Sequence, residues 1–207
     1  MEVLTAYKAE KLLSKYVNVS RSTLTHTSEE ALAFARYPAA LKLISPQALH
    51  KTEVKGVRFV HNKQDLIQQY SELLKIATEK NIHVEGILVQ DYKEGSQVFV
   101  GIKKDPTFGH VIGLGMGGIL VEEFKDVQWR TCPIKEKDFN SMLENLKFKN
   151  IIKGTRGEQN NLNELRKTLI KLSELPKKYP HLQEMDVNPL ILNHKFAVVV
   201  DARMVFE

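Results

Sequence analysis

Asn188 and Asp201 carry side chains of the kind that binds a hard divalent cation, and both lie in apolar segments close to the C-terminus. The segments read "EMDVNPLILN" and "FAVVVDAR", and Asn193-His194-Lys195 between them is suited to a turn. If the segments pair as a hairpin, residues on one face stand side by side, so the two oxygen-bearing side chains can meet. Mg²⁺ prefers such oxygen ligands and takes others from water and phosphates. The alternative stays open: Asn188-Pro189 is an ordinary turn and Asp201 is a surface acid.

His50 occurs in a loop-like segment, "SPQALHKTEVKG", between two apolar runs. As a metal ligand it lacks partners, because no cysteine or second histidine lies at ligand spacing. As a surface residue it needs no explanation. As a nucleophile it is chemically competent, because a neutral imidazole can attack phosphorus and the product transfers its phosphoryl group readily. The residue types alone leave the last two interpretations open.

Lys42 stands alone among apolar neighbours in "AALKLIS", which we expect to form a strand. A lysine in a buried strand is rare unless its charge is paired. Lys42 is therefore either an edge-strand residue that faces water or an ammonium that reaches a nucleotide phosphate.

The glycine-rich segment "GLGMGG" places Gly113, Gly115 and Gly118 in G-x-G-x-x-G spacing. A dinucleotide-binding fingerprint must open a helix, whereas the following residues 119–124 read as a strand, so we reject that interpretation. Two alternatives remain, a hairpin packed against backbone and a flap that approaches a polyphosphate closely.

The composition is that of an ordinary globular protein, with 43% apolar and 27% charged residues. The net charge of +5 is spread along the chain, and no basic stripe alternates with aromatic residues, so we expect no nucleic-acid partner. No apolar run approaches the length of a membrane span, and the N-terminal residues have no signal-peptide pattern. One cysteine, Cys132, excludes an intrachain disulfide and needs no catalytic role. We expect a cytoplasmic protein.

The apolar periodicity predicts a mixed α+β order. "SQVFVGIKKD" and "HVIGLG" should pair as a hairpin around the turn at residues 105–109. Further strands are expected at residues 39–45, 56–60, 84–92, 119–124 and 127–134, and two long strands should close the chain. Helices are expected after Thr5, Thr27 and Asn62, whose side chains suit N-caps, and over residues 136–146 and 162–178.

Taken together, the segments resemble the β unit of the ADP-forming acyl-CoA synthetases, typified by the ADP-forming acetate–CoA ligases. The resemblance runs in order over nearly the whole chain and is carried by "AALKLISPQALHKTEVKGVR", "GILVQDYKEGSQVFVGIKKDPTFGHVIGLGMGGILVEEFKDVQWRTCPI", "IIKGTRGE" and "EMDVNPLILNHKFAVVVDAR". It implies a single ATP-grasp domain over residues 1–207, in which two α/β lobes clasp a nucleotide. The N-terminal lobe would span residues 1–90, and the C-terminal lobe would span residues 91–207 and carry the Mg²⁺-binding hairpin.

The resemblance also implies a role for individual residues. It makes His50 a phosphoryl carrier, Asp186 the carboxylate that orients an incoming histidine, and Arg130 a group that holds the transferring phosphate. It assigns Mg²⁺ to Asn188 and Asp201. ATP or ADP binding is assigned to Lys42, Gln90, Asp91, Tyr92, Gly117 and Gly118.

The implied reaction converts acyl-CoA, ADP and phosphate reversibly into the acid, CoA and ATP. It implies a partner α subunit that carries the CoA-binding domain and a catalytic histidine, in an α2β2 assembly without a membrane. Three departures from the family pattern, Lys55, Cys132 and Asp91, put the preference for adenine over guanine in doubt. The alternatives are an ATP-grasp ligase with another substrate and a regulatory module that binds a nucleotide without turnover.

Overall fold

The computed structural model describes residues 1–46, 56–118, 126–154 and 159–207. Contacts group the chain into two units. Unit 1 consists of Met1–Val3, Ala9–Val19 and Glu94–Glu207, and unit 2 of Leu4–Lys8 and Ser20–Lys93. Helix α1 (Ala6–Leu13) therefore contributes residues to both units, whereas the sequence suggested one division near residue 90.

Unit 2 contains an antiparallel sheet in the order β2-β5-β3-β4. The strands are β2 (Ser22–Thr25), β3 (Ala39–Ile44), β4 (Val57–Val60) and β5 (Gly86–Asp91). Helices α2 (Ser28–Phe34) and α3 (Lys63–Glu79) pack against one face of this sheet. Two of the three predicted caps are confirmed, since Thr27 accepts from the Glu30 N–H and Asn62 from the Asp65 N–H. The Thr5 hydroxyl instead donates to the Glu85 carboxylate at 3.2 Å.

Successive residues of each strand divide between the two faces of this sheet. Leu41 and Leu43 of β3 and Val89 of β5 are buried in one cluster with residues of α2 and α3. Side chains alternate along a strand, so Ala40, Lys42 and Gln90 lie on the opposite face. We call this opposite face the Lys42 face.

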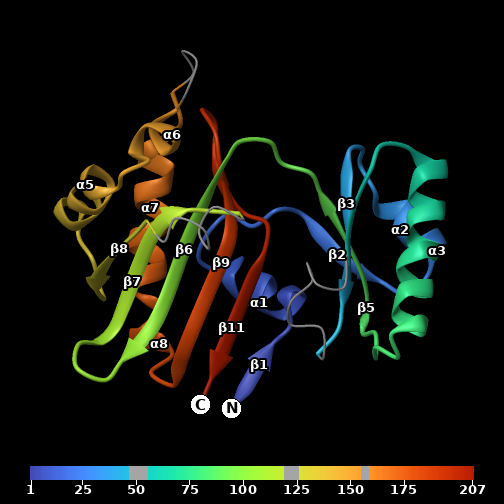
Figure 1. Cartoon of the computed structure of the whole chain (residues 1–207), viewed down its shortest axis with the longest axis horizontal. Helices are drawn as coiled ribbons and strands as arrows, with labels where there is room; N and C mark the ends of the chain where they lie inside the picture. The colour runs from blue at the N-terminus through green and yellow to red at the C-terminus, as the bar shows by residue number, and fades with distance from the viewer. Residues whose placement is uncertain (47–55, 119–125, 155–158) are drawn as a thin grey trace. The chain divides into compact units, whose positions relative to one another are not determined.

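Among the described residues of unit 1, seven strands form a sheet in the order β1-β11-β9-β6-β7-β8, with β10 beside β9. They are β1 (Glu2–Leu4), β6 (Ser96–Asp105), β7 (Gly109–Met116), β8 (Val127–Thr131), β9 (Leu182–Leu192), β10 (Ala197–Val199) and β11 (Ala202–Phe206). Because β1 lies next to β11, the two termini are close together in Figure 1. The predicted hairpin of β6 and β7 is confirmed, with Asp105 opposite Gly109.

The last predicted strand is divided into β10 and β11, which both pair with β9. The division falls at Val200 and Asp201, opposite Asn188 and Pro189. The Asp201 carbonyl accepts from Asn188 N–H at 3.2 Å, and the Pro189 carbonyl accepts from Val200 N–H at 3.3 Å. Proline has no N–H to donate to a regular ladder, so the single long strand expected here is wrong.

The helices of unit 1 are α5 (Glu136–Asn145), α6 (Lys149–Lys153), α7 (Leu162–Ser173) and α8 (Leu175–Lys178). The helix predicted over residues 162–178 is two helices, because Pro176 cannot donate within a continuing helix and occupies the first turn of α8 instead. The prediction did not include α6. No helix in the described ranges has the length and apolarity to cross a bilayer. The strand predicted over residues 119–124 lies outside the described residues.

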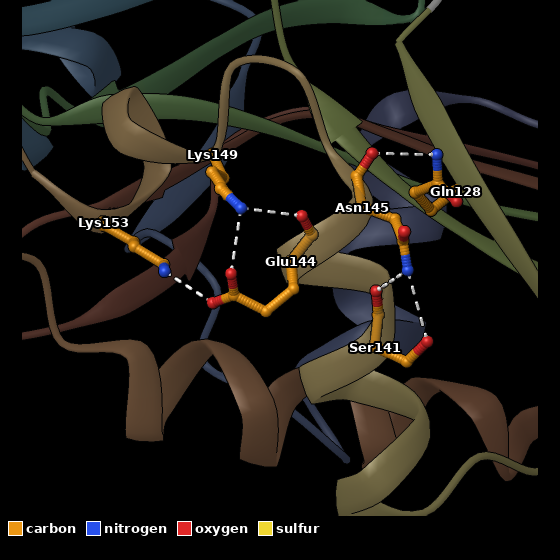
Figure 2. Close-up of polar contacts among 6 residues, drawn as sticks. All are labelled: Gln128, Ser141, Glu144, Asn145, Lys149 and Lys153. Carbon is orange, nitrogen blue, oxygen red and sulfur yellow. Dashed lines mark hydrogen bonds and ion pairs between the residues drawn. The ribbon is translucent and has the colours of Figure 1, made fainter.

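Helix α6 is tied to α5 by an exposed ion-pair cluster (Figure 2). Glu144 of α5 contacts the ammonium groups of Lys149 at 2.9 Å and Lys153 at 2.5 Å. The hydrogen bonds from Lys153 and Lys149 lower the pKa of the Glu144 carboxyl to about 2. Lys149 also donates to the Glu144 carbonyl, so one residue of α5 holds both lysines of α6.

Candidate functional site

The Lys42 face of unit 2 carries two buried polar side chains. Lys42 is 5% exposed and Gln90 is 2% exposed. Lys42 lies opposite Leu88 of β5, and Gln90 lies opposite Ala40 of β3, so the two polar residues occupy neighbouring rows of the same face. A buried cation beside a buried amide is suited to a polar, anionic ligand, because charge attraction is stronger where water is largely excluded.

Asp91 and Tyr92 follow Gln90 but point in different directions. Asp91 lies opposite Ala39, and its carboxylate contacts Arg21 at 3.0 Å. The Arg21 guanidinium also stacks on the Phe34 ring of α2, 3.7 Å from its centroid, so the Asp91 carboxylate belongs to the α2 side of the sheet. The Tyr92 N–H donates to the Pro38 carbonyl at 3.3 Å, and the residue is 43% exposed. The structure therefore groups Tyr92, and not the Asp91 side chain, with Lys42 and Gln90.

In unit 1, Asn188 of β9 and Asp201, which lies between β10 and β11, are brought together by the backbone hydrogen bond described above. The Oδ1 atom of Asn188 also accepts a hydrogen bond of 2.7 Å from the N–H of Gly118. An amide oxygen has two lone pairs, so Asn188 can accept this bond and still bind a cation. The residues present therefore fit Mg²⁺, with Asn188 and Asp201 as oxygen ligands.

Gly117 and Gly118 are positions that only glycine can fill without rearrangement. A Cβ on Gly117 would lie 2.7 Å from the backbone of Val98, and one on Gly118 would clash with Oε1 of Gln97. Gly118 also has a φ of +68°, in the left-handed region that disfavours other residues. The Gly117 N–H donates to the Gln97 carbonyl at 2.9 Å. Sequence reasoning did not identify Gln97, because neither its type nor its spacing distinguishes it.

Asp186 and Arg130 lie on opposite faces of the seven-stranded sheet. Asp186 is opposite Gly101, and this cross-strand row continues through Gly113 to Trp129. Arg130 is the next residue after Trp129, so its side chain points to the other face. There it donates at 2.8 Å to the hydroxyl of Ser141 on α5. The structure thus does not bring these two predicted residues together.

Cys132 is a half-buried thiol. Burial, with a smaller contribution from the charge of Glu174, raises its pKa to about 12. The thiol is therefore protonated at neutral pH and is not a nucleophile. A protonated thiol agrees with the expectation that Cys132 has no catalytic role.

His50 lies outside the described residues, so its predicted role as a phosphoryl carrier stays a prediction.

Comparison with known proteins agrees with this architecture. The family model described as "ATP-grasp domain" matches residues 1–206. The β subunit of acetate–CoA ligase [ADP-forming] II from Pyrococcus furiosus is 37% identical, over 99% of this chain and 92% of that protein.

Two solved structures of one relative are similar to this chain over nearly its whole length. Acetyl-coenzyme A synthetase 1 of Ca. Korarchaeum cryptofilum in complex with coenzyme A and Ca-AMPCP has a TM-score of 0.95 at 32% identity, covering 100% of this chain and 94% of that one. The same protein with coenzyme A and Mg-AMPPCP, its phosphohistidine segment pointing towards the nucleotide-binding site, has a TM-score of 0.85 at 30% identity, covering 99% and 93%. The chain therefore belongs to the ATP-grasp family, among the β subunits of the ADP-forming acetate–CoA ligases.

Proposed function

We propose that this chain is the nucleotide-binding β subunit of an ADP-forming acetate–CoA ligase. It would transfer a phosphoryl group between a phosphohistidine and ADP, so that acetyl-CoA, ADP and phosphate give acetate, CoA and ATP in a reversible reaction. The observation that carries the proposal is the hydrogen bond between Gly118 and Asn188. It links the end of the glycine-rich segment to β9, the strand that also carries Asp186.

The polar groups of unit 2 would bind the nucleotide. The Lys42 ammonium is suited to the phosphates as a compact point charge, and Gln90 and Tyr92 on the same face are suited to the nucleoside. Gly117 and Gly118 stay the predicted phosphate contacts of the glycine-rich segment, and the absence of their side chains makes room for Val98 and Gln97.

Asn188 and Asp201 would hold Mg²⁺. When bound, the ion neutralises charge on the nucleotide phosphates, which is the main requirement of phosphoryl transfer. The ion then needs only two oxygens from the protein, because phosphates and water supply its other ligands.

The transfer itself would involve His50 and Asp186. In the ATP-forming direction the N–P bond of the phosphohistidine breaks, and an O–P bond forms with a terminal phosphate oxygen of ADP. A carboxylate that accepts the N–H of an incoming histidine fixes its tautomer and stabilises its positive charge, and we assign this role to Asp186. Arg130 stays a prediction, and its contact with Ser141 would have to break before it reached a phosphate.

A separate α subunit would complete the enzyme. The Pyrococcus furiosus relative is named as a β subunit, and the Ca. Korarchaeum cryptofilum relative was solved with coenzyme A. We propose that the α subunit of this protein carries the CoA-binding domain and a further catalytic histidine, in an α2β2 assembly.

The test is phosphorylation of the chain, alone and mixed with its α subunit, from γ-labelled ATP and Mg²⁺. We expect a label that is stable to base and labile to acid, as phosphohistidine is, and that His50→Ala abolishes on this chain. The matched control is His61→Ala, since His61 is exposed in unit 2 and should leave the label unchanged.

The outcomes separate the alternatives. Normal labelling and turnover of His50→Ala with the α subunit would contradict the role of His50 and leave a ligase without this relay. Nucleotide binding without label or turnover, even with the α subunit present, would instead support a regulatory module.

A further inference from the structure

Phe59 and Tyr92 form an exposed aromatic pair in unit 2. Their ring centroids are 5.5 Å apart and their planes meet at 83°, an edge-to-face contact. Phe59 is 57% exposed and Tyr92 is 43% exposed. The two rings thus stabilise each other while leaving much of their surface to solvent.

Strand register assigns this pair to the Lys42 face. Phe59 of β4 lies opposite Ala40 of β3, and Gln90 of β5 lies opposite Ala40 from the other side. Phe59, Ala40 and Gln90 therefore form one row of side chains on the same face. The Tyr92 N–H bonds to Pro38, two residues before Ala40, so Tyr92 lies at the next row along.

The position of Lys42 on β3 shows in which order the residues of the Lys42 face follow one another along the strands. Lys42 follows Ala40 by two residues on β3, which separates their rows by about 7 Å along the strand. The row of Phe59 and Gln90 therefore lies between Lys42 and Tyr92. The order along the face is a cation, then a row with a buried amide and an aromatic ring on either side of Ala40, then a second aromatic ring.

We propose that Phe59 is the residue on which the purine base of the nucleotide stacks, with Tyr92 holding its ring in place. A nucleoside diphosphate has its charge at one end and its flat base at the other, with the ribose between them. Phosphates at Lys42 would then leave the base near Phe59 and Tyr92. Stacking on aromatic rings tolerates different bases, because every base presents a π-face, so Phe59 would strengthen the binding of adenine and guanine nucleotides alike.

This inference rests on the proposed function, and calorimetric titrations of the full-length chain can test the two separately. ADP and inorganic pyrophosphate, each with Mg²⁺, are titrated into the wild type and Phe59→Leu. Pyrophosphate has the phosphates of ADP without the ribose and the base. Phe59→Leu should weaken ADP binding by about tenfold and leave pyrophosphate binding unchanged, given the usual contribution of one aromatic–base stack.

Two further variants act as controls. Phe59→Tyr keeps the ring and should restore ADP binding. Phe108, between β6 and β7 of unit 1, is 68% exposed, and Phe108→Leu should not change ADP binding.

The inference is overturned if Phe59→Leu binds ADP as tightly as the wild type does. It is equally overturned if Phe59→Leu weakens the binding of ADP and of pyrophosphate by the same factor. Phe59 would then affect binding by supporting the fold and not by contacting the base. A wild-type chain that binds neither ligand would overturn the proposed function, and this inference with it.

Discussion

The N–H of Gly118 and the side-chain oxygen of Asn188 are joined by a hydrogen bond of 2.7 Å, although 70 positions separate the two residues. The bond connects the end of the glycine-rich segment to β9, the strand that carries Asn188, one of the two proposed Mg²⁺ ligands. The bond therefore holds the end of the glycine-rich segment next to Asn188.

Gly118→Ala should destabilise the protein by more than the ~1–2 kcal/mol that a left-handed backbone costs an alanine. The excess comes from Oε1 of Gln97, which occupies the space that the new methyl group needs. Urea unfolding measures the loss. Gly109→Ala is the matched control, because Gly109 has a similar φ of +70° and a Cβ there would meet nothing within 4 Å. Equal losses for both variants would mean that the Gln97 side chain moves aside.

Asp201→Asn and Asn188→Ala should each raise the Mg²⁺ concentration needed for half-maximal phosphoryl transfer. Even groups that only support metal ligands change metal affinity by about 10- to 100-fold, so we expect at least a tenfold rise for a ligand. A titration of activity against Mg²⁺ with saturating ADP measures it. Asn145→Ala on α5, far along the chain from both residues, is the control (Figure 2). An unchanged Mg²⁺ requirement in both ligand variants would contradict the assignment.

Cys132 should react slowly with iodoacetamide at pH 8. Alkylation requires the thiolate, and burial raises the pKa of this thiol to about 12, so almost all of it stays protonated. Unfolding in urea exposes the thiol and returns its pKa to the ordinary range, so the rate should rise by at least tenfold. Mass spectrometry follows the reaction. A native rate equal to the unfolded rate would show that the thiol is accessible and ordinary.

Glu144→Gln should reduce stability slightly at neutral pH and not at all at strongly acidic pH. The lysines of α6 lower the pKa of Glu144 from 4.5 to about 2, so the folded state favours the charged carboxylate. Its contribution is fully present above pH 4.5 and is lost as the pH falls towards 2. Thermal unfolding of both proteins at pH 7 and at a pH below 2 measures the difference, of which a part should remain at pH 3. Because the cluster is exposed, salt should reduce that difference, and insensitivity to both pH and salt would contradict this account.

Local sequence signals were sufficient to predict many of the helices and strands. Thr27 and Asn62 cap the helices that their spacing predicted, and the turn between Asp105 and Gly109 joins the predicted hairpin. These features depend on residues close in the chain, so capping and turn chemistry determine them. The mixed α+β class and the resemblance to the ATP-grasp β subunits followed from the same linear order of segments.

Only the tertiary structure decided which side chains share a face. Asp91 and Tyr92 are neighbours in the chain, yet Asp91 contacts Arg21 whereas Tyr92 meets Phe59. Asp186 and Arg130 likewise lie on opposite sides of one sheet. The physical reason is strand register, because a shift of one residue moves a side chain to the other face. That register is set by pairings between distant segments, such as β9 with β6, which local patterns do not contain.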